Sequence, residues 1–228
     1  MERYAVLGLD IGQRRDPTAL AVVEAVAERT GRVVHVGHEP PFGSCERCKP
    51  EREDVFYVRD VGRLKLGTKY PAVAEHVAEV VRALNARGLR PYLLADVTGV
   101  GRPTLDILTP KLSTFDVLVS AVTFTGGEKL RGTLGAPEVS MPKGLLVSRL
   151  QALLQTTRLR MPDNDRTRAL AEELRVYEVR VSESANLQAG AFRTGTHDDM
   201  ATALGLATLF DPSSQQVRYG PAPWPAPY

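Results

Sequence analysis

Residues 91–101 read PYLLADVTGVG. An apolar run ends at Asp96 and a glycine-rich turn follows, so the stretch predicts a buried strand, a turn and a helix. The same pattern occurs earlier, where VLGLDIG at residues 6–12 ends an apolar strand on Asp10. A carboxylate at the end of a buried strand is costly to desolvate unless a cation compensates, and a divalent metal ion is the usual candidate.

A third acidic group opens the C-terminal helix that GTHDDMATALGLA, residues 195–207, predicts from near Thr196 to about residue 210. If the strands that end at Asp10 and Asp96 are neighbours, their carboxylates lie about 4.8 Å apart. The helix then brings Asp198 or Asp199 over the same place. Such a cluster repels itself, and Mg²⁺ or Mn²⁺ relieves the repulsion. Two ions about 4 Å apart would activate a water molecule and stabilise a leaving oxygen, which indicates phosphodiester hydrolysis.

Each acid also has a purely structural interpretation. Asp10 is of a type that begins turns, and Asp96 can cap the turn over residues 98–101. Thr196 and Asp199 have the spacing of a capping box, and the helix dipole favours Asp198. The presence of all of these acids at strand ends and at one helix start is what favours the metal site.

The remaining pattern predicts an α/β fold, with a mixed sheet flanked by helices. The first strands form a meander, and residues 38–54 form a loop excursion. Residues 125–141 form a long functional loop, and a disordered Pro-rich tail over residues 212–228 follows a single domain of residues 1–211. The expected strands cover residues 4–9, 18–26, 32–36, 55–61, 92–95, 117–124 and 175–181; the expected helices cover 71–88, a segment ending near 108, 142–155, 164–173 and 196–210.

Composition limits the choice of partners. The 228 residues are 43% hydrophobic and carry a net charge of +2, which permits a polyanionic partner without requiring one. No targeting segment or membrane span is visible, so we expect a cytoplasmic protein, in the host cytoplasm if the gene belongs to a phage. Aromatic residues are only 6% of the chain, which argues against a stacking platform for single strands.

Five stretches together resemble the nuclease domain of phage large terminase subunits, a branch of the ribonuclease H-like fold. They are GLDIGQRRDPTALAVVE (residues 8–24), LKLGTKYPAVAEHVAEVVRAL (64–84), LLADVTGVGRPTLDIL (93–108), MPKGLLVSRLQALLQTTRLRM (141–161) and GTHDDMATALGLA (195–207). The resemblance implies a mixed sheet of about five strands, or slightly more, flanked by helices. It also implies an endonuclease that uses Mg²⁺ or Mn²⁺, with two ions expected, to cut double-stranded DNA during genome packaging.

The resemblance also assigns roles to the acids. Asp10 corresponds to the first-strand ligand that bridges two ions, Asp96 to the ligand on the fourth strand, and Asp198 to the ligand on the helix. A helical wheel instead places Asp199 nearer the apolar stripe of the last helix, so both acids of this pair remain candidates.

No phosphate loop with a Gly-x4-Gly-Lys-Ser/Thr pattern occurs in the sequence, so a packaging ATPase, a small terminase or a portal would be a separate partner. The chain is then an excised domain, a separate nuclease subunit or a prophage remnant. Two alternative functions stay open: a Holliday-junction resolvase, and a catalytically silent DNA-binding or assembly module of a packaging complex.

Basic residues around the acids are candidate contacts to DNA phosphates, namely Arg14, Arg15, Arg102, Lys129, Arg131 and Lys143. Arg102 and Lys143 are favoured because each starts a helix. His197 is a candidate for orienting water or phosphate, against a plain solvated histidine. A structural zinc site would use His35, His38, Cys45 and Cys48. One CxxC pair is only half of a zinc signature, so the expectation is reduced thiols without zinc.

Overall fold

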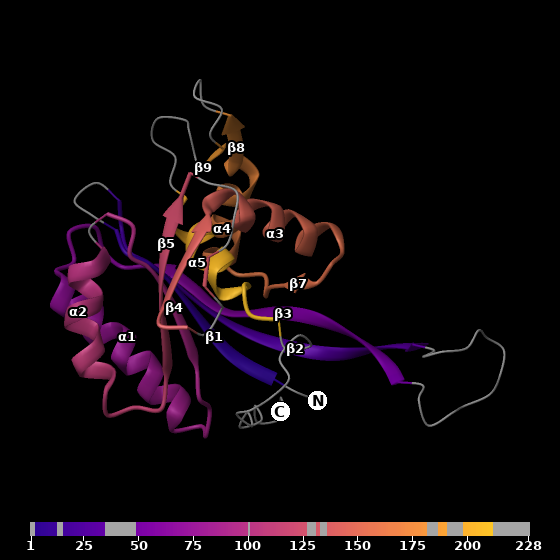
Figure 1. Ribbon diagram of the computed structural model, residues 1–228, viewed down its shortest axis with the longest axis horizontal. Coiled ribbons are helices and arrows are strands. Elements are labelled where there is room, and N and C mark those ends of the chain that lie inside the picture. Colours follow the sequence, from indigo (N-terminus) through magenta and orange to yellow (C-terminus); the bar gives the residue numbers. More distant parts are fainter. Residues whose placement is uncertain are drawn as a thin grey trace.

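A seven-stranded mixed sheet forms the centre of the computed structural model (Figure 1), which describes residues 3–12, 16–34, 49–99, 101–126, 131–132, 136–181, 187–190 and 198–211. The strand order is β6-β5-β4-β1-β2-β3-β7. β2 is antiparallel to β1 and β3, whereas β4, β5 and β6 continue in parallel from β1. The strands are β1 (Arg3–Asp10), β2 (Ala19–Val34), β3 (Lys49–Arg63), β4 (Tyr92–Asp96), β5 (Leu118–Thr125), β6 (Glu138–Pro142) and β7 (Leu159–Arg160).

Helices cover both faces of the sheet. α1 (Tyr70–Asn85) and α2 (Gly101–Leu112) pack on one face, and α3 (Lys143–Gln155), α4 (Asp165–Val176) and α5 (Asp199–Ala207) lie on the other, as Figure 1 shows. A separate antiparallel pair, β8 (Glu178–Val181) and β9 (Leu187–Gly190), completes the described elements. Within the described residues, no helix is long and apolar enough to cross a membrane.

Covering both faces explains why β1 is apolar almost throughout. Alternate side chains point to opposite faces of a strand. Ala5, Leu7 and Leu9 enter the core on the α1 side, while Tyr4 and Val6 enter the core beneath α5. The continuous apolar run therefore marks a central strand that is buried on both faces.

α5 is buried along its whole length, between the sheet on one side and α3 and α4 on the other. It lies so close to β1 that a Cβ atom on Gly8 would collide with the carbonyl oxygen of Ala203 and the backbone nitrogen of Ala207. Only a glycine fits at this approach. The contact fixes the start of α5 near the end of β1.

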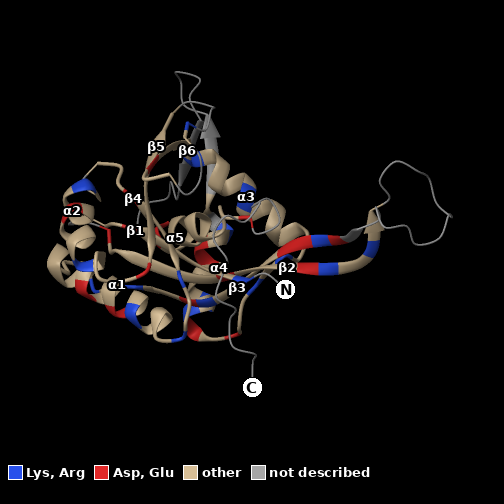
Figure 2. Cartoon of the chain, turned by 60° about the horizontal axis from the view of Figure 1, so that its bottom comes forward, with Lys and Arg blue, Asp and Glu red and all other residues tan. Residues whose placement is uncertain are grey.

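The sequence interpretation was wrong about the first strands. β2 is one strand of 16 residues, where the second and third strands of a three-stranded meander were expected, and β3 begins at Lys49, inside the expected loop 38–54. The two strands form a ribbon that extends beyond the core, with acidic and basic residues along it (Figure 2). The cross-strand pair Arg29↔Arg52 is exposed, as are residues 31–34, so this part has no apolar alternation by which a strand is recognised.

Two further predictions need correction. β6 overlaps residues 125–141, which were expected to be a loop. The seven strands of the sheet agree with the expected five strands or slightly more. The last helix begins at Asp199, three residues later than expected. The expected Pro-rich tail, residues 212–228, lies outside the described residues.

Candidate metal centre

Asp10 and Asp96 lie side by side at the ends of two central strands. β1 and β4 are parallel neighbours, and Asp10 is the register partner of Asp96. Both side chains are half-buried. The two acids therefore lie next to each other as predicted, because parallel strands that end together bring their last side chains to the same edge of the sheet.

The environment of these carboxylates disfavours their charged forms. Burial, followed by repulsion from Asp96, raises the pKa of Asp10 well above its usual value; Asp198 and Asp199 add smaller contributions. Burial also raises the pKa of Asp96, and hydrogen bonds from Thr98 oppose the increase. Lys143 opposes both increases through its positive charge.

Asp198 joins this cluster through Lys143. The Lys143 ammonium, at the start of α3, donates a hydrogen bond of 2.9 Å to Oδ2 of Asp198 and lies 5.9 Å from the centre of the Phe124 ring. Asp198 is the N-cap residue of α5, but its side chain makes no capping hydrogen bond. One lysine thus interacts with three carboxylates that come from β1, β4 and the start of α5.

Asp199 has a different environment. Its side chain is 5% exposed, and its Oδ2 accepts a hydrogen bond of 2.7 Å from Nε of Arg63. Arg63 also pairs with Glu173 of α4, and Glu173 accepts a hydrogen bond of 2.9 Å from the backbone of Ala201. Asp199 is therefore part of an ion network that ties β3, α4 and α5 together.

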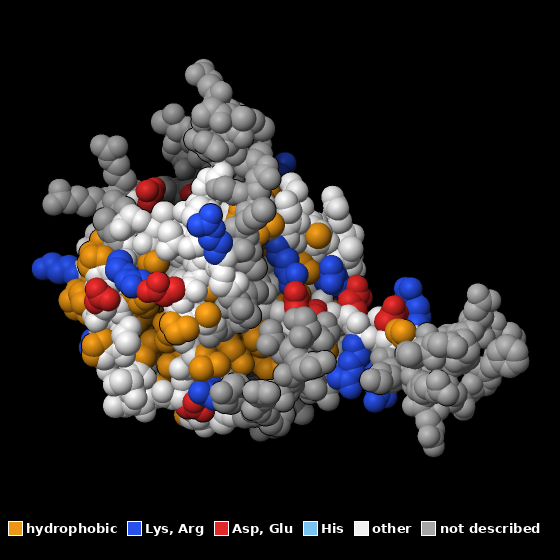
Figure 3. Space-filling model, viewed as in Figure 1, with side chains coloured by type: hydrophobic (Ala, Val, Ile, Leu, Met, Phe, Trp, Pro, Cys, Tyr) orange, Lys and Arg blue, Asp and Glu red, His pale blue; other side chains and the backbone are white. Residues whose placement is uncertain are grey.

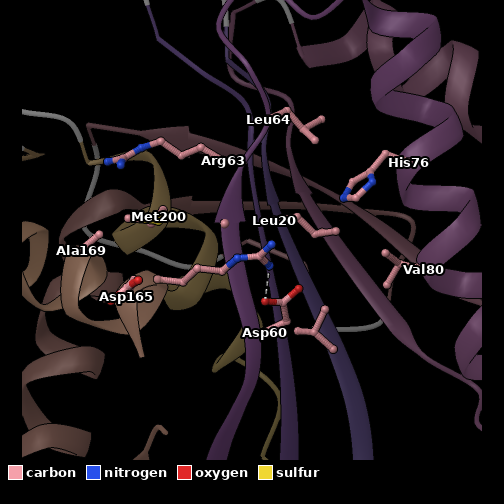
Figure 4. A pocket seen from close by; sticks show the side chains of 12 residues that line it. Leu20, Asp60, Arg63, Leu64, His76, Val80, Asp165, Ala169 and Met200 are labelled. Carbon is pink, nitrogen blue, oxygen red and sulfur yellow. Dashed lines mark hydrogen bonds and ion pairs between the residues drawn. The ribbon is translucent and has the colours of Figure 1, made fainter. Parts of the chain in front are cut away.

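Figure 4 shows Arg63 extending from β3 on the side away from α1, beside a cavity of about 500 Å³. The second arginine of that cavity, Arg166, is paired with Asp60 at 2.7 Å. Both arginines that line the cavity are engaged by carboxylates, so the cavity is not arranged as an anion pocket.

The structural interpretations of the acids have mixed outcomes. Oδ1 of Asp96 accepts a hydrogen bond of 2.7 Å from the backbone of Thr98, so the turn-cap interpretation is confirmed. This does not remove Asp96 from the cluster. The capping box of Thr196 and Asp199 is wrong, because the helix begins at Asp199 itself, with Asp198 as its N-cap residue.

Among the described residues, no group of three or more His, Cys, Asp or Glu side chains is close enough to hold a metal ion in this geometry. The Lys143–Asp198 ion pair is one physical reason, since it holds one of the three carboxylates on a cation that the protein itself supplies.

The other predicted site residues are dispersed or outside the described part of the chain. Lys143, predicted to contact DNA phosphates, donates a hydrogen bond to Asp198. Arg102 pairs with Glu138 at 2.5 Å, and Arg131 is exposed beside β6. The residues that lie outside the described ranges are Arg14, Arg15, Lys129, His197, His35, His38, Cys45 and Cys48.

Sequence reasoning missed Tyr177, Arg63 and Glu173. Tyr177 is buried directly after α4, and its hydroxyl interacts electrostatically with Lys143 and Asp198. Glu173 is an acid on a helix with few apolar residues, but no spacing rule connects it with Arg63, 110 positions earlier in the chain.

No family model and no curated protein matches the sequence. Solved structures do match. The large terminase nuclease from thermophilic phage G20c with bound cobalt is 17% identical, with a TM-score of 0.55 over 90% of this chain and 80% of that one. A mutant nuclease domain of the large terminase subunit gp2 of bacterial virus Sf6, with manganese, is 13% identical, with a TM-score of 0.58 over 90% of this chain and 87% of that one.

The chain has the fold of the large terminase nuclease domains. The predicted resemblance is thereby confirmed at the level of the fold, a mixed sheet flanked by helices. The G20c nuclease has also been solved with bound magnesium, and the Sf6 domain with calcium. At these sequence identities the likeness concerns the arrangement of the elements, so the chemistry has to be argued from the residues of this chain.

Proposed function

We propose that this terminase-like fold is a metal-dependent endonuclease that hydrolyses phosphodiester bonds of double-stranded DNA, in the manner of the nuclease that cuts viral DNA during packaging. The observation that carries the proposal is the register pairing of Asp10 with Asp96, with Asp198 linked to both through Lys143. Carboxylates that repel one another at a strand end are costly to fold, and such groups occur preferentially where a protein acts chemically.

The donor set fits a hard divalent cation. Carboxylate oxygens are the ligands that Mg²⁺ and Mn²⁺ prefer, and the raised pKa of Asp10 indicates that its charged form lacks sufficient compensation from the protein alone. We assign Asp10, Asp96 and Asp198 as the residues that would hold the metal. Asp199 is left out of this set because its carboxylate is already paired with Arg63 in the ion network.

When bound, the metal would supply an activated water and stabilisation of the leaving oxygen, and two ions would do both. The protein's own residues prepare the site. Asp96 is held in place by the turn that it caps, through Thr98. Lys143 balances part of the negative charge until the metal binds. Arg131 and Arg102 are further candidates for phosphate contacts.

The motor that drives packaging would be another chain or another part of a longer protein. The 228 residues contain no phosphate loop, so a packaging ATPase is the partner that this proposal requires. A small terminase or a portal would join the same assembly.

The test is nicking and linearisation of a supercoiled plasmid in Mn²⁺ or Mg²⁺. We expect the wild type to cut and Asp96→Asn to lose at least about a hundredfold in rate, because the substitution removes a charged ligand but keeps its shape. Asp106→Asn, on the exposed side of α2, is the matched control and keeps wild-type cutting. A wild type that binds DNA without cutting it indicates the silent DNA-binding module, and cutting confined to four-way junctions indicates the resolvase.

A further inference from the structure

Two buried hydroxyl groups near the acidic cluster make no hydrogen bond of ordinary geometry with the described residues. They belong to Tyr177, which is 7% exposed, and Thr202, which is 0% exposed. Hydroxyl groups are rarely left buried without a partner, because they lose hydrogen bonds to water on folding. The two hydroxyls therefore indicate that a hydrogen-bonding group lies against them in another state of the site.

The position of the two hydroxyls points to Lys143. Thr202 is one helical turn after Asp198, and its backbone nitrogen donates to the carbonyl of Asp198 at 2.8 Å. The two side chains thus project from the same side of α5. Tyr177 follows α4, and its hydroxyl interacts with both Thr202 and Lys143.

Lys143 consequently interacts with a second oxygen besides that of Asp198. Burial alone would lower the pKa of Lys143, but Tyr177, Asp198 and Asp10 together raise the pKa above its ordinary value. Asp198 holds the ammonium now, through the hydrogen bond of 2.9 Å. The Tyr177 oxygen is a second acceptor within the same buried space.

Binding of a divalent cation would place a second positive charge beside this ammonium. The two cations compete for Asp198, and a displaced ammonium that found no acceptor would remain buried and unpaired, which is strongly unfavourable. The cost would reduce the affinity for the metal. An acceptor close to Lys143 removes most of that cost.

This inference rests on the proposed function. We propose that Tyr177 is a positioning residue: its oxygen accepts a hydrogen bond from the Lys143 ammonium when a divalent cation binds Asp198, while its own O–H donates to Thr202. Tyr177 thereby frees Asp198 to bind the metal while Lys143 stays in the site. Packing alone would be served equally well by phenylalanine, since the ring lies in the apolar cluster beneath α5.

The experiment is a calorimetric titration of Mn²⁺ into four proteins: the wild type, Tyr177→Phe, Lys143→Ala and the double variant. We expect Tyr177→Phe to weaken Mn²⁺ binding about three- to tenfold when Lys143 is present. In the Lys143→Ala background the same substitution is expected to change nothing, because no ammonium needs an acceptor. A merely structural role for Tyr177 would change affinity equally in both backgrounds, and that result overturns the proposal.

Tyr4→Phe is the control, since Tyr4 lies in the same apolar cluster but packs on Tyr92 and Phe210, away from the acids. It should bind Mn²⁺ as the wild type does. Thr202→Val provides a second variant if Tyr177→Phe does not fold, and it should weaken binding only when Lys143 is present. A wild type that binds no Mn²⁺ removes the proposed function as well, whereas equal binding by wild type and Tyr177→Phe removes the role of Tyr177 alone.

Discussion

Asp198 and Asp199 are adjacent in the sequence but engage different partners. Asp198 is half-buried and bound to Lys143, which also acts on Asp10 and Asp96. Asp199 is almost fully buried and bound to Arg63. The first residue therefore belongs to the candidate metal centre, and the second belongs to the ion network that joins α5 to β3 and α4.

Paired substitutions separate these two roles. We expect Asp199→Asn to destabilise the protein by about 3 kcal/mol, because it leaves the Arg63 charge with less compensation in a largely buried place. Asp198→Asn should keep the melting temperature within a few degrees of the wild type but abolish Mn²⁺-dependent cutting. Thermal unfolding and plasmid nicking measure the two effects. If Asp199→Asn melted like the wild type and lost cutting, the assignment of the two acids would have to be reversed.

At the scale of elements, the packing of α5 against β1 determines whether the site can form. The helix starts beside Asp198 and crosses β1 at Gly8, where there is no room for a side chain. Since Gly8 is two residues before Asp10, the same close contact sets the distance between an acid on the strand and an acid at the helix start.

Gly8→Ala tests this dependence. The added methyl group would meet backbone atoms of α5, which cannot rotate away, so α5 must shift from β1. We expect a loss of about 2 kcal/mol or more in stability and weaker Mn²⁺ binding. Gly144→Ala is the matched control: it adds the same methyl group on α3, next to Lys143, into open space. This control should keep metal binding and gain stability slightly, because alanine favours a helix.

Most helices and strands that build the core were predicted from the sequence, whereas the segments that lie outside the core were predicted wrongly. Apolar runs located β1, β4, β5 and the helices because burial requires those residues. The outer part of the β2–β3 ribbon has both faces exposed, so its charged residues gave no strand signal. The start of α5 was placed too early because Thr196 and Asp199 matched a capping pattern, whereas packing on Gly8 and the ion pair of Asp199 fix the helix.

At the scale of the whole molecule, the site could be predicted in part. Asp10 and Asp96 followed from strand ends and adjacency. Lys143 was expected near the acids as a phosphate contact, but its pairing with Asp198 was not predicted. Arg63 and Tyr177 were not predicted at all, because their positions depend on how β3 and α4 meet α5, and no local pattern in the sequence records that. Figure 3 shows Lys and Arg side chains scattered over the visible face, with no continuous basic band among the described residues there.

The stability of the metal-free protein should depend on pH through Asp10. Because the folded state raises the pKa of Asp10, this group stabilises the fold below about pH 4, the ordinary range of an aspartate, and the contribution is lost as the pH rises through the shifted pKa. We therefore expect Asp10→Asn to melt a few degrees above the wild type at neutral pH without metal, and at the same temperature near pH 4. Melting curves from pH 4 to 8 measure this difference.

Mn²⁺ should reverse that order at neutral pH, since the wild type then gains a bound cation and Asp10→Asn does not. Asp106→Asn serves as the control, and it should follow the wild type throughout. A wild type whose melting temperature rises steadily between pH 4 and 8 without metal would contradict the account of Asp10.

The central position of α5 also bears on the synthesis of the protein. α5 follows all seven strands of the main sheet along the chain, yet it fills the middle of one core. A polypeptide interrupted before Asp198 would leave the apolar face of β1 and β2 open to solvent, and it would be recognised by chaperones and proteases. Unfinished copies that already carry Asp10 and Asp96 would therefore lack the core that holds these acids in a folded form.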